Sequence, residues 1–371
     1  MCTSLVYTDA SGQPYFGRTL ELTINLPYQV AYLPAGFAFQ SQVGDHVPVD
    51  FTAKYPFVAV TMPGRMPTAD APLGLADLKV VEGLNAAGLT FSVLSYPAAG
   101  GGQQAVDRTR EVLAAADLGG WALGQFATVA ELKAALETQP VMLEPLAVLG
   151  GAPTPFHYVV HDAAGASLVI EFTRGERAVY DNPVGVMTNG PEFTWHLTNL
   201  GNYTFLSNVD TPSATFGTYM AVQPDSGIAT AGLPSSNTSV GRFVRAAYYA
   251  QFTEKAATPD AAVLALAHIM NNFDRPRGVT IDYPAPGGGH LEVQGLEADG
   301  TTAYATEFTT WTSLADLTRR LFFVRDYGRL NYTRIDLAAL ATLVEPRLVP
   351  LAGLPEFPSD GTDALRAAPS R

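Results

Sequence analysis

Short apolar runs separated by polar turns make up the beginning, the middle and the end of this chain. Residues 4–8 and 14–18 have the alternation of a strand and flank the turn-forming stretch 9–12, which predicts a hairpin at the N-terminus. Centring the hairpin on that turn places Cys2 opposite Thr19. The chain therefore opens with two antiparallel strands that bring its first residues beside the second strand.

The same pattern predicts the remaining elements. Strand-like runs recur at 28–33, 57–62, 80–97 (a pair around a turn), 156–161, 167–172, 303–311 and 319–327. Helices are predicted at 108–119, from a capping box at Thr128, at 243–252 and at 258–272. No repeat and no shift in composition marks a second domain. We predict one α+β domain over residues 1–350 and a weakly ordered tail at 351–371, which is rich in Pro, Gly and Asp.

Charge and composition exclude several classes of partner. The 371 residues are 47% apolar, which is ample for a large core, and carry a net charge of −13. Nucleic acids and anionic membrane surfaces attract basic segments, so neither is an expected partner. No apolar run approaches the roughly 18 residues of a membrane span and no signal-peptide pattern opens the chain, which predicts a cytoplasmic protein without membrane insertion.

The only cysteine follows the initiator methionine and becomes the N-terminal residue once Met1 is removed, a removal that a small second residue favours. An α-amine with a pKa of about 7.7–8.0 can take the proton of a neighbouring thiol. In the predicted hairpin Arg18 lies near Cys2 and favours its thiolate, while Glu21 can hold the protonated amine. The alternative is a structural cysteine beside a solvated Arg18, and this stretch alone leaves both open.

The opening residues M-C-T-S-L-V-Y-T-D-A-S-G-Q-P-Y-F-G-R-T-L-E resemble the start of the choloylglycine hydrolase family, which includes bile salt hydrolases and penicillin V acylases. Members of this family are N-terminal nucleophile amidohydrolases. The resemblance implies a four-layer αββα sandwich, a nucleophilic Cys2 and a reaction that needs no metal or cofactor.

Two internal segments resemble the family's oxyanion hole. The stretch 184–203 matches a family segment whose first Asn contributes to the active site, which implies that Asn189 is an amide donor to the oxyanion. The alternative is an Asn that satisfies its own turn before Pro191. In the strand pair 80–97 the family ends the second strand with another oxyanion-hole Asn, where this chain has Ser95, a departure that leaves a hydroxyl as the possible donor.

A third segment, 232–245, matches the family without a gap, although Ser235 and Ser236 replace a Gly-Asp pair. The match implies that Arg242 is the second active-site arginine and that Arg245 orients the following helix. In bile salt hydrolases the loop before this segment belongs to the tetramer contact. The resemblance therefore implies a homo-oligomer, either a tetramer or a dimer.

Metal-dependent and serine-dependent hydrolysis have no sequence signal here. His157 and His161 are four residues apart in a predicted strand, which separates their side chains by about 13 Å, and no third ligand stands nearby. Neither an H-E-x-x-H nor a G-x-S-x-G motif occurs. We expect no metal site.

These observations predict hydrolysis of a linear amide C–N bond in a small-molecule N-acyl amide, through an acyl-enzyme on Cys2. Conjugated bile salts and penicillin V are the first candidate substrates, and N-acyl homoserine lactones are a further one. The family typically has Asp where Glu21 stands, so Glu21 and Ser95 also raise the alternative of a weakly active or inactive ligand-binding homologue. Acyl transfer to an amine is a third possibility.

Overall fold

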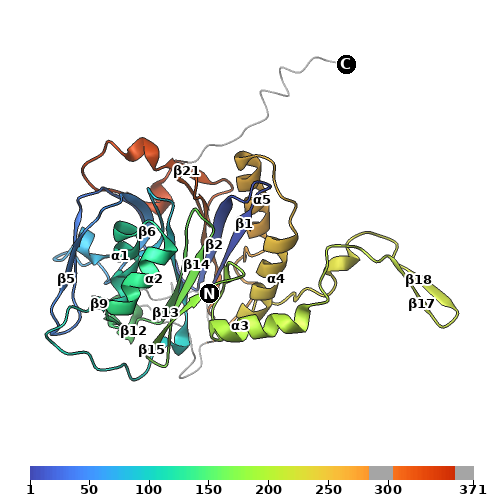
Figure 1. Cartoon of the computed structure of the whole chain (residues 1–371), viewed down its shortest axis with the longest axis horizontal. Coiled ribbons are helices and arrows are strands. Elements are labelled where there is room, and N and C mark those ends of the chain that lie inside the picture. Colours follow the sequence, from blue (N-terminus) through green and yellow to red (C-terminus); the bar gives the residue numbers. More distant parts are fainter. Residues whose placement is uncertain (284–303, 356–371) are drawn as a thin grey trace, which may run out of the picture.

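The computed structural model describes residues 1–283 and 304–355. Two antiparallel sheets pack face to face, and helices cover both outer surfaces (Figure 1). The predicted four-layer αββα sandwich is confirmed. Within the described ranges, no helix is both long enough and apolar enough to cross a membrane. Of the predicted tail, residues 351–355 begin with the short 3-10 helix Leu351–Gly353, and the remainder lies outside the described residues.

The first sheet carries the N-terminal strand and has six strands. Their spatial order is β16 (Val186–Met187), β1 (Cys2–Thr8), β2 (Pro14–Leu22), β19 (Phe308–Asp316), β20 (Leu321–Asp326) and β21 (Thr333–Asp336). Helix α4 (Ser239–Phe252) packs on β1, and α5 (Pro259–Asn271) packs on β2 and β19. Gly17 permits the close approach of α5, because a Cβ at this position would lie 2.8 Å from Met270 Cγ.

The second sheet has eight strands and faces the first. Their spatial order is β15 (Glu176–Asp181), β14 (Ser167–Thr173), β13 (Phe156–His161), β8 (Thr90–Ser95), β7 (Leu78–Asn85), β6 (Phe57–Pro63), β3 (Gln29–Leu33) and β22 (Arg347–Pro350). Helix α1 (Leu118–Gln125) packs on β7 and β8, and α2 (Val129–Thr138) packs on β14. The strands predicted between residues 28 and 172 therefore exist and form one sheet.

Shorter elements connect the layers. They are β4 (Ala38–Ser41), β5 (Val49–Thr52), β9 (Leu113–Ala114), β10 (Val141–Met142), β11 (Pro145–Leu146), β12 (Ala152–Pro153) and α3 (Phe193–Leu200). The helix predicted at 108–119 is wrong, since this stretch holds β9, which pairs with β10, and α1 begins only at Leu118. Its apolar residues 112–115 are all buried, and a buried extended run has the same composition as a buried helix.

Other predicted boundaries hold or shift by a few residues. The helices after Thr128 and Thr258 begin as expected, because each threonine hydroxyl accepts a hydrogen bond from the backbone N–H three residues later. Helix α4 begins at Ser239, four residues before the predicted start at 243. Strand β19 begins at Phe308, and position 303, where the prediction began it, lies outside the described residues.

The N-terminal hairpin forms as predicted, with a register one residue away from the expected one. Cys2 pairs with Leu20, and Thr3 pairs with Thr19. The connection has five residues, 9–13, because the Asp9 backbone N–H donates to Gln13 O at 3.1 Å. The Asp9 carboxylate also accepts from Gln13 N at 2.9 Å, which closes the loop over the extra residue. The correction matters because side chains alternate along a strand, so one residue decides which face each of them occupies.

The segment between α3 and α4, residues 201–238, projects from the body of the molecule (Figure 1). It contains the two-stranded hairpin β17 (Ser213–Phe216) and β18 (Tyr219–Val222), which projects beyond α4 (Figure 1). Large apolar side chains are exposed along this projecting segment, namely Phe205, Val209, Phe216, Tyr219, Met220 and Val222.

Candidate active site

Cys2 lies near one end of β1, in the space between the two sheets, and is 3% exposed. Strand β1 pairs with β16, where Ser4 lies opposite Met187. Because these strands are antiparallel, the residues just after β16 lie level with the N-terminus. The Cys2 backbone N–H accordingly donates to Asn189 Oδ1 at 2.9 Å. The sheet thus brings together two residues that are far apart in the sequence.

Arg18 lies on β2, on the same face as Cys2, and is fully buried. Its Nη2 donates to Cys2 Sγ at 3.3 Å and also to Val93 O, and its Nη1 donates to Val81 O at 3.2 Å. The guanidinium carbon lies 4.7 Å from the centre of the Trp311 ring, on the neighbouring strand β19. These contacts exclude the alternative of a solvated Arg18.

Asn189 joins three parts of the site through one amide group. Its Oδ1 accepts from Cys2 N and from Arg242 Nη2 at 2.7 Å, and its Nδ2 donates to Ser95 O at 2.7 Å. These partners lie on other segments, so the side chain does not serve its own turn. Because a primary amide carries two N–H groups, the second one is available to a ligand in the adjoining cleft.

Arg242 enters the site from the first turn of α4 and is fully buried. It donates to Cys2 O, to Thr3 Oγ1 at 2.7 Å and to Asn189 Oδ1. Burial lowers the pKa of this arginine and the charge of Glu21 raises it. A cation at the start of a helix opposes the helix dipole, so the placement costs stability that the contacts to Cys2 and Asn189 must offset.

Arg245, one turn further along α4, has a different task. Its Nη1 donates to Pro234 O at 2.7 Å and to Ser236 O at 2.6 Å. Arg245 therefore ties α4 to the segment that precedes it, and the expectation that Arg245 orients this helix stays a prediction.

Glu21 is fully buried but does not contact an amine through its carboxylate. Its Oε1 accepts from Thr309 Oγ1 at 3.2 Å, and its Oε2 has no hydrogen-bond partner within residues 1–283 and 304–355. The backbone of Glu21 instead holds Met1: Glu21 N donates to Met1 O at 2.7 Å, and the Met1 amine donates to Glu21 O. Since Glu21 is an odd number of residues from Arg18, the two side chains leave opposite faces of β2.

Ser95 ends β8 and contributes its backbone carbonyl to Asn189. Ser95 and Asn189 line a cleft of about 790 Å³ that opens beside Met1. Its other lining residues are Leu22, Thr23, Ile24, Pro97, Gly190, Ser236, Asn237, Thr238, Ser239, Arg275, Thr280, Ile281, Asp282, Ala305 and Glu307. The cleft combines the apolar side chains of Leu22 and Ile24 with the charged ones of Arg275, Asp282 and Glu307.

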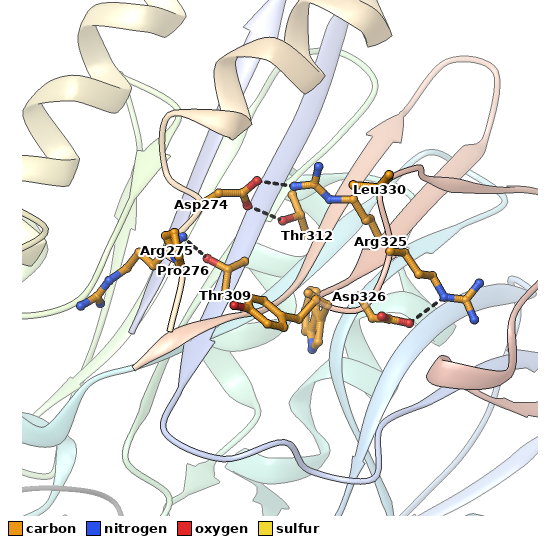
Figure 2. Close-up of a pocket in the computed structure, with 11 residues that line it drawn as sticks. Asp274, Arg275, Pro276, Thr309, Thr312, Arg325, Asp326 and Leu330 are labelled. Atoms are coloured by element: carbon orange, nitrogen blue, oxygen red, sulfur yellow. Dashed lines mark hydrogen bonds and ion pairs between the residues drawn. The ribbon is translucent and has the colours of Figure 1, made fainter. Parts of the chain in front are cut away.

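The charged residues of the cleft include a pair that no sequence motif indicated. Arg275 Nη1 bonds to Glu307 Oε2 at 2.9 Å, and its Nη2 donates to Thr280 Oγ1 at 2.8 Å. The other Glu307 oxygen lies 3.6 Å from the Met1 amine. The adjacent Asp274 does not share this pair, because Arg325 and Thr312 bind it on the far side, around a separate pocket of about 290 Å³ (Figure 2).

A second buried polar cluster supports the segment that carries Asn189. His157 Nε2 lies 2.9 Å from Thr188 O, and its Nδ1 lies 3.2 Å from Glu171 Oε2. The ring of Tyr96 stacks on His157 with their centres 4.7 Å apart. His157 therefore belongs to a contact network between β13, β14 and residue 188. The described part of the chain contains no group of three His, Cys, Asp or Glu side chains placed to hold a metal ion.

Comparison with known proteins assigns the chain to a family. The sequence profile of the linear amide C–N hydrolases, choloylglycine hydrolase family, matches residues 2–285. The chain belongs to this family. Among its choloylglycine hydrolase relatives, the bile salt hydrolase/transferase of Clostridium perfringens is 26% identical over 340 residues, which cover 91% of this chain and 92% of that protein.

Solved structures agree on the fold, that of the N-terminal nucleophile hydrolases. A mutant conjugated bile acid hydrolase from Clostridium perfringens superposes with a TM-score of 0.76 at 22% identity, covering 94% of this chain and 96% of the other. Penicillin V acylase from Agrobacterium tumefaciens superposes with a TM-score of 0.70 at 21% identity, covering 94% and 92%.

Proposed function

We propose that this choloylglycine hydrolase family member cleaves small-molecule N-acyl amides through an acyl-enzyme on Cys2. The observation that carries the proposal is the contact of 3.3 Å between Arg18 Nη2 and Cys2 Sγ in a water-poor space beside a cleft. A buried guanidinium favours the thiolate over the thiol, and the thiolate is the nucleophilic form.

The proposed reaction begins with removal of Met1, which occupies one side of the cleft and blocks the amine of Cys2. The Cys2 amine takes the thiol proton, and the thiolate attacks the amide carbon to form a C–S bond. The carbonyl oxygen becomes an oxyanion, to which Asn189 donates through its second amide N–H, with Ser95 as a possible further donor. Arg242 holds Asn189 and the Cys2 carbonyl in place.

The acyl-enzyme then forms and breaks down. Collapse of the oxyanion breaks the C–N bond as the Cys2 amine passes its proton to the leaving amine. Water attacks the thioester with the same amine as base, which releases a carboxylic acid and restores the thiol. Glu21 positions the amine through its charge, and a carboxylate displaced relative to the family's Asp lowers the rate.

The substrate class rests on the relatives and the cleft. Relatives named for bile salt hydrolysis and for penicillin V acylation make these two amides the first candidates. The apolar side chains of Leu22 and Ile24 suit a hydrophobic acyl group, and Arg275 offers a cation to an anionic amine half. N-acyl homoserine lactones, transfer of the acyl group to an amine, and ligand binding without turnover are the alternatives.

Two measurements on one sample test the proposal. Intact mass reports whether Met1 is absent, and incubation with glycocholate, taurocholate or penicillin V reports release of glycine, taurine or 6-aminopenicillanic acid. We expect release of at least one product, which Cys2→Ala abolishes. Added amine separates hydrolysis from transfer, because only a transferase forms the new amide. A mature Cys2 chain that releases nothing from any of the three would favour a binding protein or an unusual acyl group.

We also propose that the projecting segment joins copies of the chain into a tetramer or a dimer. Its support is the exposed apolar surface on β17 and β18, since a monomer gains nothing from leaving such residues in water. Light scattering after size exclusion measures the assembly. Replacing Tyr219 and Met220 by Ser is expected to yield monomers, and a wild-type chain that runs as a monomer at micromolar concentration contradicts the proposal.

A further inference from the structure

One buried carboxylate next to the site has no part in the mechanism above. Glu82 lies on β7 of the eight-stranded sheet, is fully buried and faces β2. Its Oε2 lies 3.5 Å from Arg18 Nη1 and accepts from Ser92 Oγ at 2.5 Å. Its Oε1 has no hydrogen-bond partner among the residues that the structure describes.

Glu82 and Cys2 contact the same cation from two sides. Arg18 reaches Glu82 with Nη1 and Cys2 Sγ with Nη2, and all three residues are at most 3% exposed. A second anion buried beside one cation has no compensating charge, and this is costly in a medium of low dielectric constant. Two acids in such a position cannot both ionise freely, in the same way that paired carboxylates share one proton.

The other charged groups around the site do not remove this competition. Arg242 faces Cys2 from the α4 side, but the opposite charge that raises its pKa most is Glu21, ahead of Cys2 and Glu307. Tyr28 also lies close to Arg18 and Cys2, and burial raises the pKa of its phenol, so that it stays neutral at ordinary pH. Around Glu82 itself, the interactions that favour its charged form come from Arg18 and the Ser92 hydroxyl.

We propose that Glu82 and Cys2 compete for the single positive charge of Arg18, so that Glu82 is a positioning residue that sets how readily the Cys2 thiol loses its proton. When Glu82 keeps its proton, the charge of Arg18 is available to the thiolate. When Glu82 ionises, Arg18 is neutralised and the thiol holds its proton more tightly. The inference rests on the proposed function only in taking the thiolate as the reactive form.

The buried position of Glu82 is consistent with a competition between its carboxyl and the Cys2 thiol. Burial raises the pKa of Glu82 to about 8, against the opposing effects of Arg18 and Ser92. The carboxyl therefore holds its proton at neutral pH, where the Cys2 thiol must ionise. Above about pH 8 Glu82 loses that proton, and its negative charge then competes with the thiolate for Arg18.

Alkylation of Cys2 tests the proposal without a substrate. Because Cys2 is the only cysteine, the mass added by iodoacetamide reports this thiolate alone. We would measure the alkylation rate from about pH 5.5 to 9.5 for the mature wild type, Glu82→Gln and the control Glu144→Gln, which changes a carboxyl outside the site whose pKa is also raised by burial. The Cys2 amine titrates in all three proteins and cancels in the comparison. A protein that hydrolyses nothing still gives this curve, so failure of the proposed function is distinguishable.

The expected result is a broad or two-step rise for the wild type and one sharper rise for Glu82→Gln, with its midpoint lower by about one pH unit or more. Glu144→Gln should follow the wild-type shape. Identical curves for wild type and Glu82→Gln overturn the proposal. A higher midpoint in Glu82→Gln also overturns it, because it would mean that Glu82 only holds Arg18 in place.

A second variant covers the case in which Glu82→Gln does not fold. Ser92→Ala removes the hydroxyl that donates to Glu82, so the carboxyl keeps its proton to higher pH. Its alkylation midpoint should fall in the same direction by a smaller amount. An unchanged or higher midpoint in folded Ser92→Ala contradicts the competition as directly as the Glu82 variant does.

Discussion

Two Arg–Glu pairs lie close to the same cysteine and differ mainly in the exposure of the glutamate to water, since both arginine side chains are at most 2% exposed. Arg18 and Glu82 are 3.5 Å apart between the sheets, and both are fully buried. Arg275 and Glu307 are 2.9 Å apart at the cleft, where the Glu307 side chain is 21% exposed. The shorter contact is the one that water and salt can screen.

The difference shows that distance alone does not rank charged contacts. In the interior, an uncompensated charge is costly, so Glu82 and Arg18 determine each other's state and that of the thiol. At the cleft, Glu307 can turn to solvent if Arg275 is lost, and its charge mainly affects which substrates enter the cleft. We therefore expect the inner pair to govern stability and thiol chemistry, and the outer pair to govern selection of the substrate's charge.

Removing the arginine from each pair is the strongest test of this difference between the two pairs. Arg18→Leu removes the donor that the buried carbonyls of Val81 and Val93 share, and is expected to lower the free energy of unfolding by about 2–6 kcal/mol, since each unpaired buried acceptor costs about 1–3 kcal/mol. Arg275→Leu leaves a carboxylate that reaches water and should cost about 1 kcal/mol. Urea unfolding followed by tryptophan fluorescence measures both, and equal losses would refute the distinction.

The pH dependence of stability gives a second test. The pKa of Glu82 is raised to about 8 in the folded protein from an ordinary value of 4.5, so the folded state binds this proton more tightly than the unfolded state does. Its contribution to stability is complete below about pH 4.5 and is lost as pH rises through about 8, at up to about 1.4 kcal/mol per pH unit. Glu82→Gln should flatten thermal unfolding midpoints between pH 6 and 9, whereas Glu307→Gln should not; parallel curves for all three proteins would count against the buried proton.

The smallest expected effect concerns the cleft. Glu307→Gln removes a negative charge and frees Arg275, so amides with an anionic amine half should be cleaved several-fold faster relative to amides of uncharged amines, which corresponds to about 1 kcal/mol. The ratio of kcat/KM for the two kinds of amide measures this selectivity. High salt should reduce the gain, because the site is open to water. A selectivity that does not respond to the substitution would place Glu307 outside the path of the substrate.

Much of the fold was predictable because strand and cap signals are local. The hairpin at the N-terminus, the strands from residue 28 to 172 and the helices after Thr128 and Thr258 depend on alternation and capping within a few residues. The extended conformation of the buried run at 112–115 was not predictable, because it depends on pairing with β10 and on Ser41, whose hydroxyl accepts from Ala114 N.

Site residues were predictable where they stand in a segment that resembles the family. They were not predictable where their role depends on contacts with the eight-stranded sheet. Cys2, Arg18, Asn189 and Arg242 come together as the resemblance implies, although their catalytic roles remain proposals. Glu82 is an ionisable residue in an apolar strand, and only the packing of β7 against β2 shows which cation it meets. Alternation along β2 separates the side chains of Glu21 and Arg18 in any register, but only the observed register shows that Arg18 shares the face of Cys2.

The length of the five-residue loop at 9–13 decides which side chains of β2 face the active site. With this loop, Arg18 faces the interior with Cys2, while Gly17 faces α5. Inserting or deleting one residue would exchange the two faces of β2, turning Arg18 toward Met270 and the glycine toward the thiol. The loop can therefore change its length only in steps of two, and its composition is restricted as well, because the Asp9 carboxylate accepts from Gln13 N and Gly12 has a φ of 80°.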